Sequence, residues 1–131
     1  MKKDSTPIMS AALGNSTLPA SGTMNSIGIE VNQLYDLSIQ ASWTGAPVGT
    51  FTVQVSNDIV PLAPTTSNPV GPDPAANVIN WSTYTGSAVV TTGTAGNWMW
   101  ITQLAPYKWV RLSYTATSGT GTVAANFFAK G

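Results

Sequence analysis

The 131-residue sequence predicts one all-β domain of the β-sandwich or jelly-roll-like class, with about eight short antiparallel strands. Three observations support this prediction. Apolar and polar residues alternate over several short stretches, Gly and Pro clusters separate those stretches, and no stretch has the i, i+3, i+4, i+7 spacing of an amphipathic helix.

Residues 1–26 are rich in Ser, Thr, Gly, Ala and Asn and show no sustained period. They predict a flexible or extended N-terminal arm with little to bury. Two alternatives stay open for this arm: a disordered tail, or an extended segment that orders against a neighbouring subunit. The β-sandwich domain is then expected to span residues 27–131.

The domain begins with alternation at Ile27, Ile29 and Val31. The clearest strand follows over 35–43, where Tyr35, Leu37, Ile39, Ala41 and Trp43 share one face. A turn rich in Gly and Pro leads to a second alternating stretch over 50–56, which we expect to be its hairpin partner.

Residues 59–79 interrupt the strands with five prolines: Pro61, Pro64, Pro69, Pro72 and Pro74. Proline lacks the N–H that a central strand needs, so a long surface loop is expected here. Loops of this length inside a compact domain are often functional. The segment is therefore the best candidate for a contact loop, with a passive insertion as the alternative.

Five further strands are expected after this loop, separated by turns that contain Gly or Pro. Their ranges are 81–84, 88–92, 97–104, 108–117 and 122–129.

Charge is scarce, since charged residues make up 8% of the chain and the formal net charge is zero. Soluble proteins usually carry about a quarter charged residues, which keep neighbouring molecules apart. The deficit favours a homo-oligomer or a larger assembly, with an uncharged secreted domain as the alternative. The few basic residues form no run, so nucleic acid is not an expected partner. No apolar run is long enough for a membrane span of about 18 residues, and the apolar stretch near the N-terminus is too short for a secretion signal.

Catalysis is not expected. The chain has neither His nor Cys, and its five carboxylates are spread over separate segments. No cofactor is expected, because the Gly-rich pieces lack the features of a phosphate-binding loop. Ser56, Asn57 and Asp58 are the one hint of a metal site, and such residues at the end of a strand are usually turn formers.

Aromatic residues are the remaining signal, because one small domain holds five tryptophans. Trp43 shares a face with apolar neighbours and is expected in the core. Trp98, Trp100 and Trp109, with Tyr107 beside the last, are candidates for a glycan-stacking platform or an intersubunit contact. The alternative for these three indoles is packing beneath the Pro-rich loop. The candidate interaction residues are thus Trp98, Trp100, Trp109, Tyr107, Pro61, Pro64, Pro69 and Pro72.

Two blocks carry a resemblance to a known class of proteins. They are Leu37-Ser38-Ile39-Gln40-Ala41-Ser42-Trp43-Thr44-Gly45 continuing through 49–58, and Asn80-Trp81 followed by 107–115 and 118–122. These blocks resemble small virion proteins of tailed bacteriophages and cover roughly 35–58 and 80–130.

The resemblance implies a β-sandwich structural protein that is assembled in the host cytoplasm and located in the virion. Within that class we expect a capsid decoration or cement protein that binds the major capsid protein lattice, commonly as a trimer. A carbohydrate-binding or host-attachment module of a head or tail fibre is the first alternative. A tail, neck or baseplate component is the second.

Overall fold

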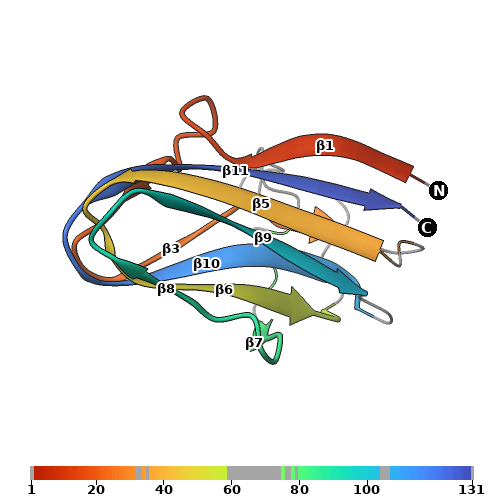
Figure 1. Cartoon of the computed structure of the whole chain (residues 1–131). Coiled ribbons are helices and arrows are strands. Elements are labelled where there is room, and N and C mark those ends of the chain that lie inside the picture. Colours follow the sequence, from red (N-terminus) through yellow and green to blue (C-terminus); the bar gives the residue numbers. More distant parts are fainter. Residues whose placement is uncertain are drawn as a thin grey trace, which may run out of the picture.

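The computed structural model describes residues 2–31, 34, 36–58, 75, 78, 80–103 and 107–130. These residues form eleven strands and no helix. The strands make two antiparallel sheets that face each other (Figure 1). The prediction of an all-β sandwich is confirmed, with more strands than the sequence indicated.

The first sheet, called sheet A, runs in the order β1-β11-β5-β9. Its strands are β1 (Lys2–Met9), β11 (Gly121–Lys130), β5 (Asp36–Gly45) and β9 (Gly96–Gln103). The short β2 (Thr17–Leu18) also pairs with β11. Sheet A therefore has β1 at one edge and β9 at the other.

The second sheet, called sheet B, runs in the order β3-β10-β6-β7. Its long strands are β10 (Trp109–Ser118) and β6 (Val48–Ser56). The short strands β3 (Thr23–Asn25) and β4 (Ile29–Glu30) pair with β10, whereas β7 (Ser82–Thr83) and β8 (Val89–Thr92) pair with β6.

Residues 1–26 differ from the expected arm. This segment carries β1, β2 and β3, which pair with β11 and β10 of the same chain. Ile8, Met9 and Leu18 are fully buried in the core. These three residues anchor the segment in the core, although two of them are adjacent and their spacing shows no strand period.

The expected hairpin between 35–43 and 50–56 is also corrected, because β5 lies in sheet A and β6 in sheet B. The chain crosses between the sheets through a tight turn in which Gly45 adopts a φ of 85°. The return crossing from β10 to β11 lies against this turn, and the Ala46 N–H donates to the Thr120 carbonyl at 2.9 Å. Both crossings need Gly because the left-handed backbone and the close approach exclude a side chain.

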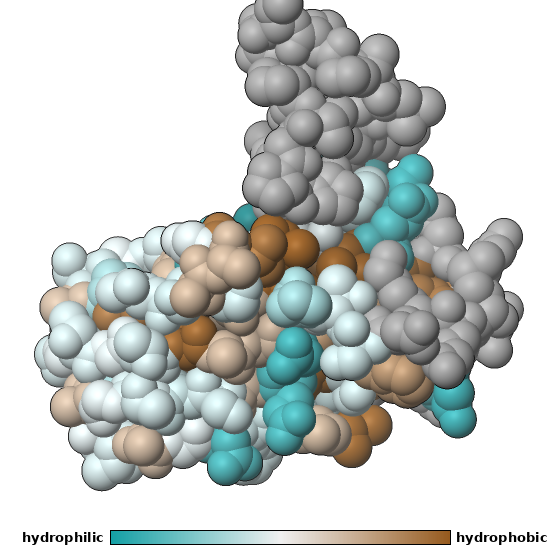
Figure 2. Space-filling model, turned by 90° about the horizontal axis from the view of Figure 1, so that it is seen from above, coloured by the Kyte–Doolittle hydropathy of each residue, from teal (hydrophilic) through white to brown (hydrophobic). Residues whose placement is uncertain are grey.

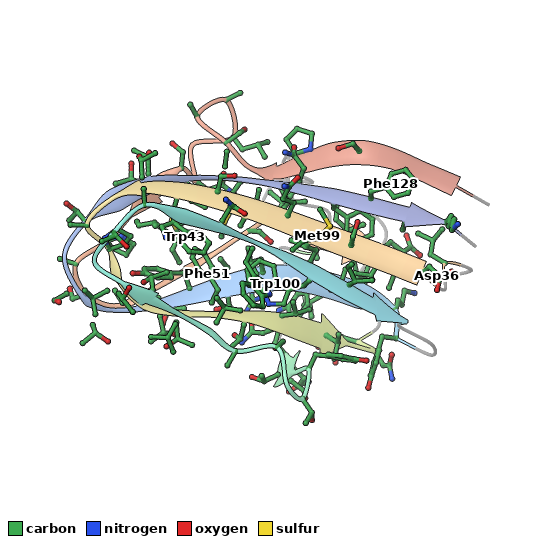
Figure 3. The ribbon with its side chains drawn as sticks, in the orientation of Figure 1. Asp36, Trp43, Phe51, Met99, Trp100 and Phe128 are labelled. Atoms are coloured by element: carbon green, nitrogen blue, oxygen red, sulfur yellow. The ribbon has the colours of Figure 1, made fainter. Side chains whose placement is uncertain are left out.

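The core is built around four aromatic rings contributed by both sheets. Trp43 of β5 and Trp100 of β9 meet Phe51 of β6 at centroid separations of 5.2 and 6.0 Å, and Tyr114 of β10 lies 4.8 Å from Phe51. Figure 3 shows Trp43, Phe51 and Trp100 between the two sheets. Each indole N–H donates to a backbone carbonyl, Trp43 to Thr94 at 3.1 Å and Trp100 to Ser87 at 2.7 Å. These bonds tie the connection between β7 and β9 to the core.

A smaller cluster lies on the face of sheet B that points away from sheet A. Trp109 is buried there against Ala75 and Val78, which belong to the Pro-rich segment 59–79. Gly28 touches Ala75 so closely that a Cβ at position 28 would collide with it. Ala75 and Val78 are therefore packed onto the sandwich.

Candidate interaction surface

The outer face of sheet A, which points away from sheet B, carries three large exposed apolar side chains. Met99 is 47% exposed, Ile101 79% and Phe128 39%. We call these three residues the outer-face patch. Figure 3 shows Met99 and Phe128 over sheet A with Asp36 at the start of β5.

The registers of β11 and β9 with β5 explain how the outer-face patch forms. Ser38 of β5 has Phe128 of β11 as its neighbour on one side and Ile101 of β9 on the other. A short side chain between two large ones leaves a depression in the surface. The structure has a hollow of about 250 Å³ here, lined among others by Ser38, Met99, Ile101 and Phe128.

One acidic and one basic side chain border this hollow. Asp36 of β5 and Lys130 of β11 are register partners, both are exposed, and both line the hollow. A partner that covers the patch would meet an apolar centre and a rim of two opposite charges. Protein interfaces commonly combine an apolar centre with a polar rim.

A second hollow, the edge hollow, opens between the sheets beside β9 and has a volume of about 300 Å³. Its lining residues are Val53, Tyr84, Thr85, Gly86, Ser87, Trp98, Met99, Trp100 and Ile101. Trp98 is 51% exposed here, while Trp100 at the base is 6% exposed. An exposed indole beside an exposed hydroxyl, here that of Thr85, is an arrangement on which a sugar ring can stack.

The structure separates the aromatic residues that the sequence suggested as one platform. Trp98 borders the edge hollow, Trp100 belongs to the core, and Trp109 is buried beneath Ala75 and Val78. Tyr107 is half-buried and lies edge-on to Tyr84 at 6.2 Å. Of the three tryptophans, Trp98 alone offers a large surface to a ligand. The prolines at 61, 64, 69 and 72 lie outside the described residues.

Ser56, Asn57 and Asp58 act as turn and loop formers in the structure. The Asp58 N–H donates to Ser56 Oγ at 3.1 Å, and the Lys108 N–H donates to Asn57 Oδ1 at 3.1 Å. The Asp58 carboxylate accepts the Asn80 N–H at 2.8 Å. Within the part of the chain that the structure describes, no group of three or more acidic, His or Cys residues could hold a metal ion.

Sequence reasoning missed the outer-face patch, although the sequence contains a signal for it. Phe127 and Phe128 are adjacent on one strand, so strand alternation sends one ring into the core and the other outward. Trp98 to Ile101 is likewise an unbroken apolar run in a half-buried strand. Large apolar residues on both faces of a strand indicate a second covered surface.

Figure 2 shows one face of the molecule, seen from above the view of Figure 1, with grey atoms over part of it. Most of the coloured residues are pale, as expected for a chain rich in Ser, Thr and Gly, and few are strongly hydrophilic. The described residues include no helix long and apolar enough to cross a membrane.

A scan against protein-family models finds no family that matches this chain, and a search of curated proteins finds no similar sequence.

Proposed function

We propose that this protein is a non-catalytic structural component of a bacteriophage virion, a decoration protein that binds the major capsid protein lattice as an oligomer. The resemblance of residues 35–58 and 80–130 to small phage virion proteins supports the virion assignment. The mode of action follows from the surface of the sandwich.

The observation that carries this proposal is the outer-face patch. Met99, Ile101 and Phe128 together expose apolar surface on the outer face of sheet A, beside a hollow. Contiguous exposed apolar surface on a soluble domain marks a place where another protein binds.

The charge deficit supports the same role. A neutral chain with 8% charged residues has little long-range repulsion from its own copies or from a crowded lattice. Many copies can therefore lie side by side on a capsid. The affinity for the lattice is then expected to depend little on salt, since few ion pairs contribute to it.

The test is co-sedimentation of the purified protein with capsids assembled without it. We expect the wild-type chain to sediment with the capsids and Phe128→Lys to bind far more weakly, because the lysine would be buried against the lattice. Val90→Lys is the matched control, since Val90 is 65% exposed but lies on β8, outside the patch. Wild-type protein that stays in the supernatant contradicts the proposal. Binding to purified tails instead would assign the chain to the tail, neck or baseplate.

A second candidate function, glycan binding during host attachment, is favoured by the edge hollow. Trp98 offers an exposed indole, and the exposed Thr85 places a hydroxyl in the same lining. A glycan array tests this function. Binding that is lost in Trp98→Ala supports it, and an array without signal for the wild-type chain removes it.

A further inference from the structure

The edge strand β9 lacks the features that usually protect the edge of a sheet. Within the described part of the chain β9 pairs with β5 alone, from Gly96 to Gln103 and without a register shift. Its eight residues include no charge and no proline. Asn97, Trp98, Met99 and Ile101 are all exposed. A long, regular, uncharged edge strand is a template for pairing with another chain.

The opposite edge of sheet A is protected. Strand β1 contains Lys2, Lys3 and Pro7, and its pairing with β11 has two register shifts. Charged residues, prolines and bulges are the devices by which natural sheets prevent edge-to-edge association. The contrast between the two edges of sheet A indicates that β9 is the edge at which another strand can pair.

The edges of sheet B offer little to pair with. Strands β3 and β4 have three and two residues, and β7 and β8 have two and four. Strands this short give few backbone hydrogen bonds. Among the strands that the structure describes, β9 is therefore the one edge suited to sheet extension.

We propose that β9 pairs antiparallel with β9 of a second copy of this chain, which joins two A sheets across a two-fold axis. A second copy is the fitting occupant because the contact carries no charge, so two identical edges meet without repulsion. Pairing around a threefold axis would need a second, different edge on each copy. Because β9 is the one suitable edge among the described strands, both copies use the same edge. Such a contact is isologous and closes as a dimer.

The alternation of side chains fixes the register of this pairing. The two-fold axis must be perpendicular to the sheet, so residues that oppose each other lie on the same face. An axis at Trp100 places Met99 opposite Ile101 of the second copy, and the same contact recurs by symmetry. An axis at Met99 would instead oppose Asn97 to Ile101, and an axis at Ile101 would oppose Met99 to Gln103. The register centred on Trp100 matches the largest apolar residues and is the one we assign.

Pairing in this register would join the two outer-face patches. Ile101 lies beside Phe128 across Ser38 within each copy. With Met99 of the second copy next to Ile101, one apolar strip runs across the dimer. This consequence rests on the proposed docking to a lattice, whereas the pairing itself is a property of the isolated chain.

The first experiment measures the mass of the purified chain by light scattering and sedimentation over a dilution series. We expect twice the mass of one chain at high concentration and dissociation on dilution. A chain that stays monomeric at the highest concentration it tolerates overturns the proposal and leaves β9 to a strand of another protein. A trimer overturns it as well.

Two double variants at the same positions test the register. In Met99→Lys with Ile101→Lys, lysines oppose each other at both contacts, and we expect a monomer. In Met99→Lys with Ile101→Glu, each lysine opposes a glutamate only when the axis lies at Trp100, and we expect a dimer. Both sites are exposed, so folding should be kept and is checked by thermal unfolding. Val90→Lys, an exposed site on another strand, should stay dimeric.

The proposed pairing is overturned if the lysine–lysine variant remains a dimer, and it is also overturned if both double variants become monomers. Neither outcome contradicts the proposed binding to capsids. Conversely, a wild-type dimer that fails to bind capsids removes the proposed function and leaves the pairing intact. The two proposals can therefore fail separately.

Discussion

Replacing Tyr114 with Phe should make the protein more stable. Tyr114 is fully buried at the inner face of β10, and no hydrogen-bond partner lies within reach of its hydroxyl among the described residues. The hydroxyl instead packs against Gly49, where an added Cβ would lie 2.6 Å from it. A buried hydroxyl without a partner costs about 1–3 kcal/mol relative to the hydrated unfolded state.

Tyr114→Phe removes this cost and keeps the ring stack with Phe51, whose centroid lies 4.8 Å away. The small void that the oxygen leaves offsets part of the gain, so we expect a net increase of about 1 kcal/mol in the free energy of unfolding. With an entropy of unfolding of roughly 0.28 kcal/mol/K for a chain of this length, the Tm should rise by about 4 °C. Calorimetry and urea unfolding measure both quantities.

Ser26→Ala is the matched control, because it removes a buried hydroxyl that is fully bonded. Ser26 Oγ accepts the Leu112 N–H and donates to the Ile27 carbonyl, both at 2.8 Å. Its removal should lower the free energy of unfolding by about 1–3 kcal/mol. A fall in stability for Tyr114→Phe similar to that of Ser26→Ala would contradict this prediction, since it would mean that the tyrosine hydroxyl has a partner.

Three further predictions test other parts of the structure. Gly28→Ala should lower the free energy of unfolding, measured in urea, by about 1–3 kcal/mol, because the new Cβ collides with Ala75. Adding Ala75→Gly should restore most of this loss, and no recovery would contradict the contact between the two residues. Acrylamide should quench part of the tryptophan fluorescence, and Trp98→Phe should remove most of the accessible part; unchanged quenching would place the exposed indole elsewhere. At concentrations where the chain is monomeric, Ile101→Ala should change stability by less than about 0.5 kcal/mol and Ile39→Ala should cost about 2–5 kcal/mol; similar losses for both would contradict the assigned faces.

The fold class could be predicted from the sequence because strand alternation is a local property. The stretch that contains Ile39 and Trp43 shows it clearly, and both residues are buried as expected. The topology could not be predicted, because a turn such as Gly45 to Pro47 can join neighbouring strands or cross between sheets. Which of these forms depends on contacts distant in sequence, such as the bond from Ala46 to Thr120.

The sequence grouped Trp98, Trp100 and Trp109 as one candidate platform, and the structure gives them different exposures. Trp98 is exposed as a ligand platform requires, whereas Trp100 is buried although the two share a strand face. The two indoles differ in exposure because they lie at different positions along the opening between the sheets, and the spacing of residues in the sequence does not reveal these positions. The β1 strand was missed because Ile8 and Met9 are adjacent, so alternation gives no signal there, and a bulged edge strand can bury both.

The most direct test of the proposed role is an electron cryomicroscopy reconstruction of the particle that contains this protein. We expect density for the sandwich on the capsid shell, with the outer face of sheet A against the lattice and Phe128 in the contact. A shell without this density, or a bound sandwich whose outer-face patch points to solvent, would contradict it.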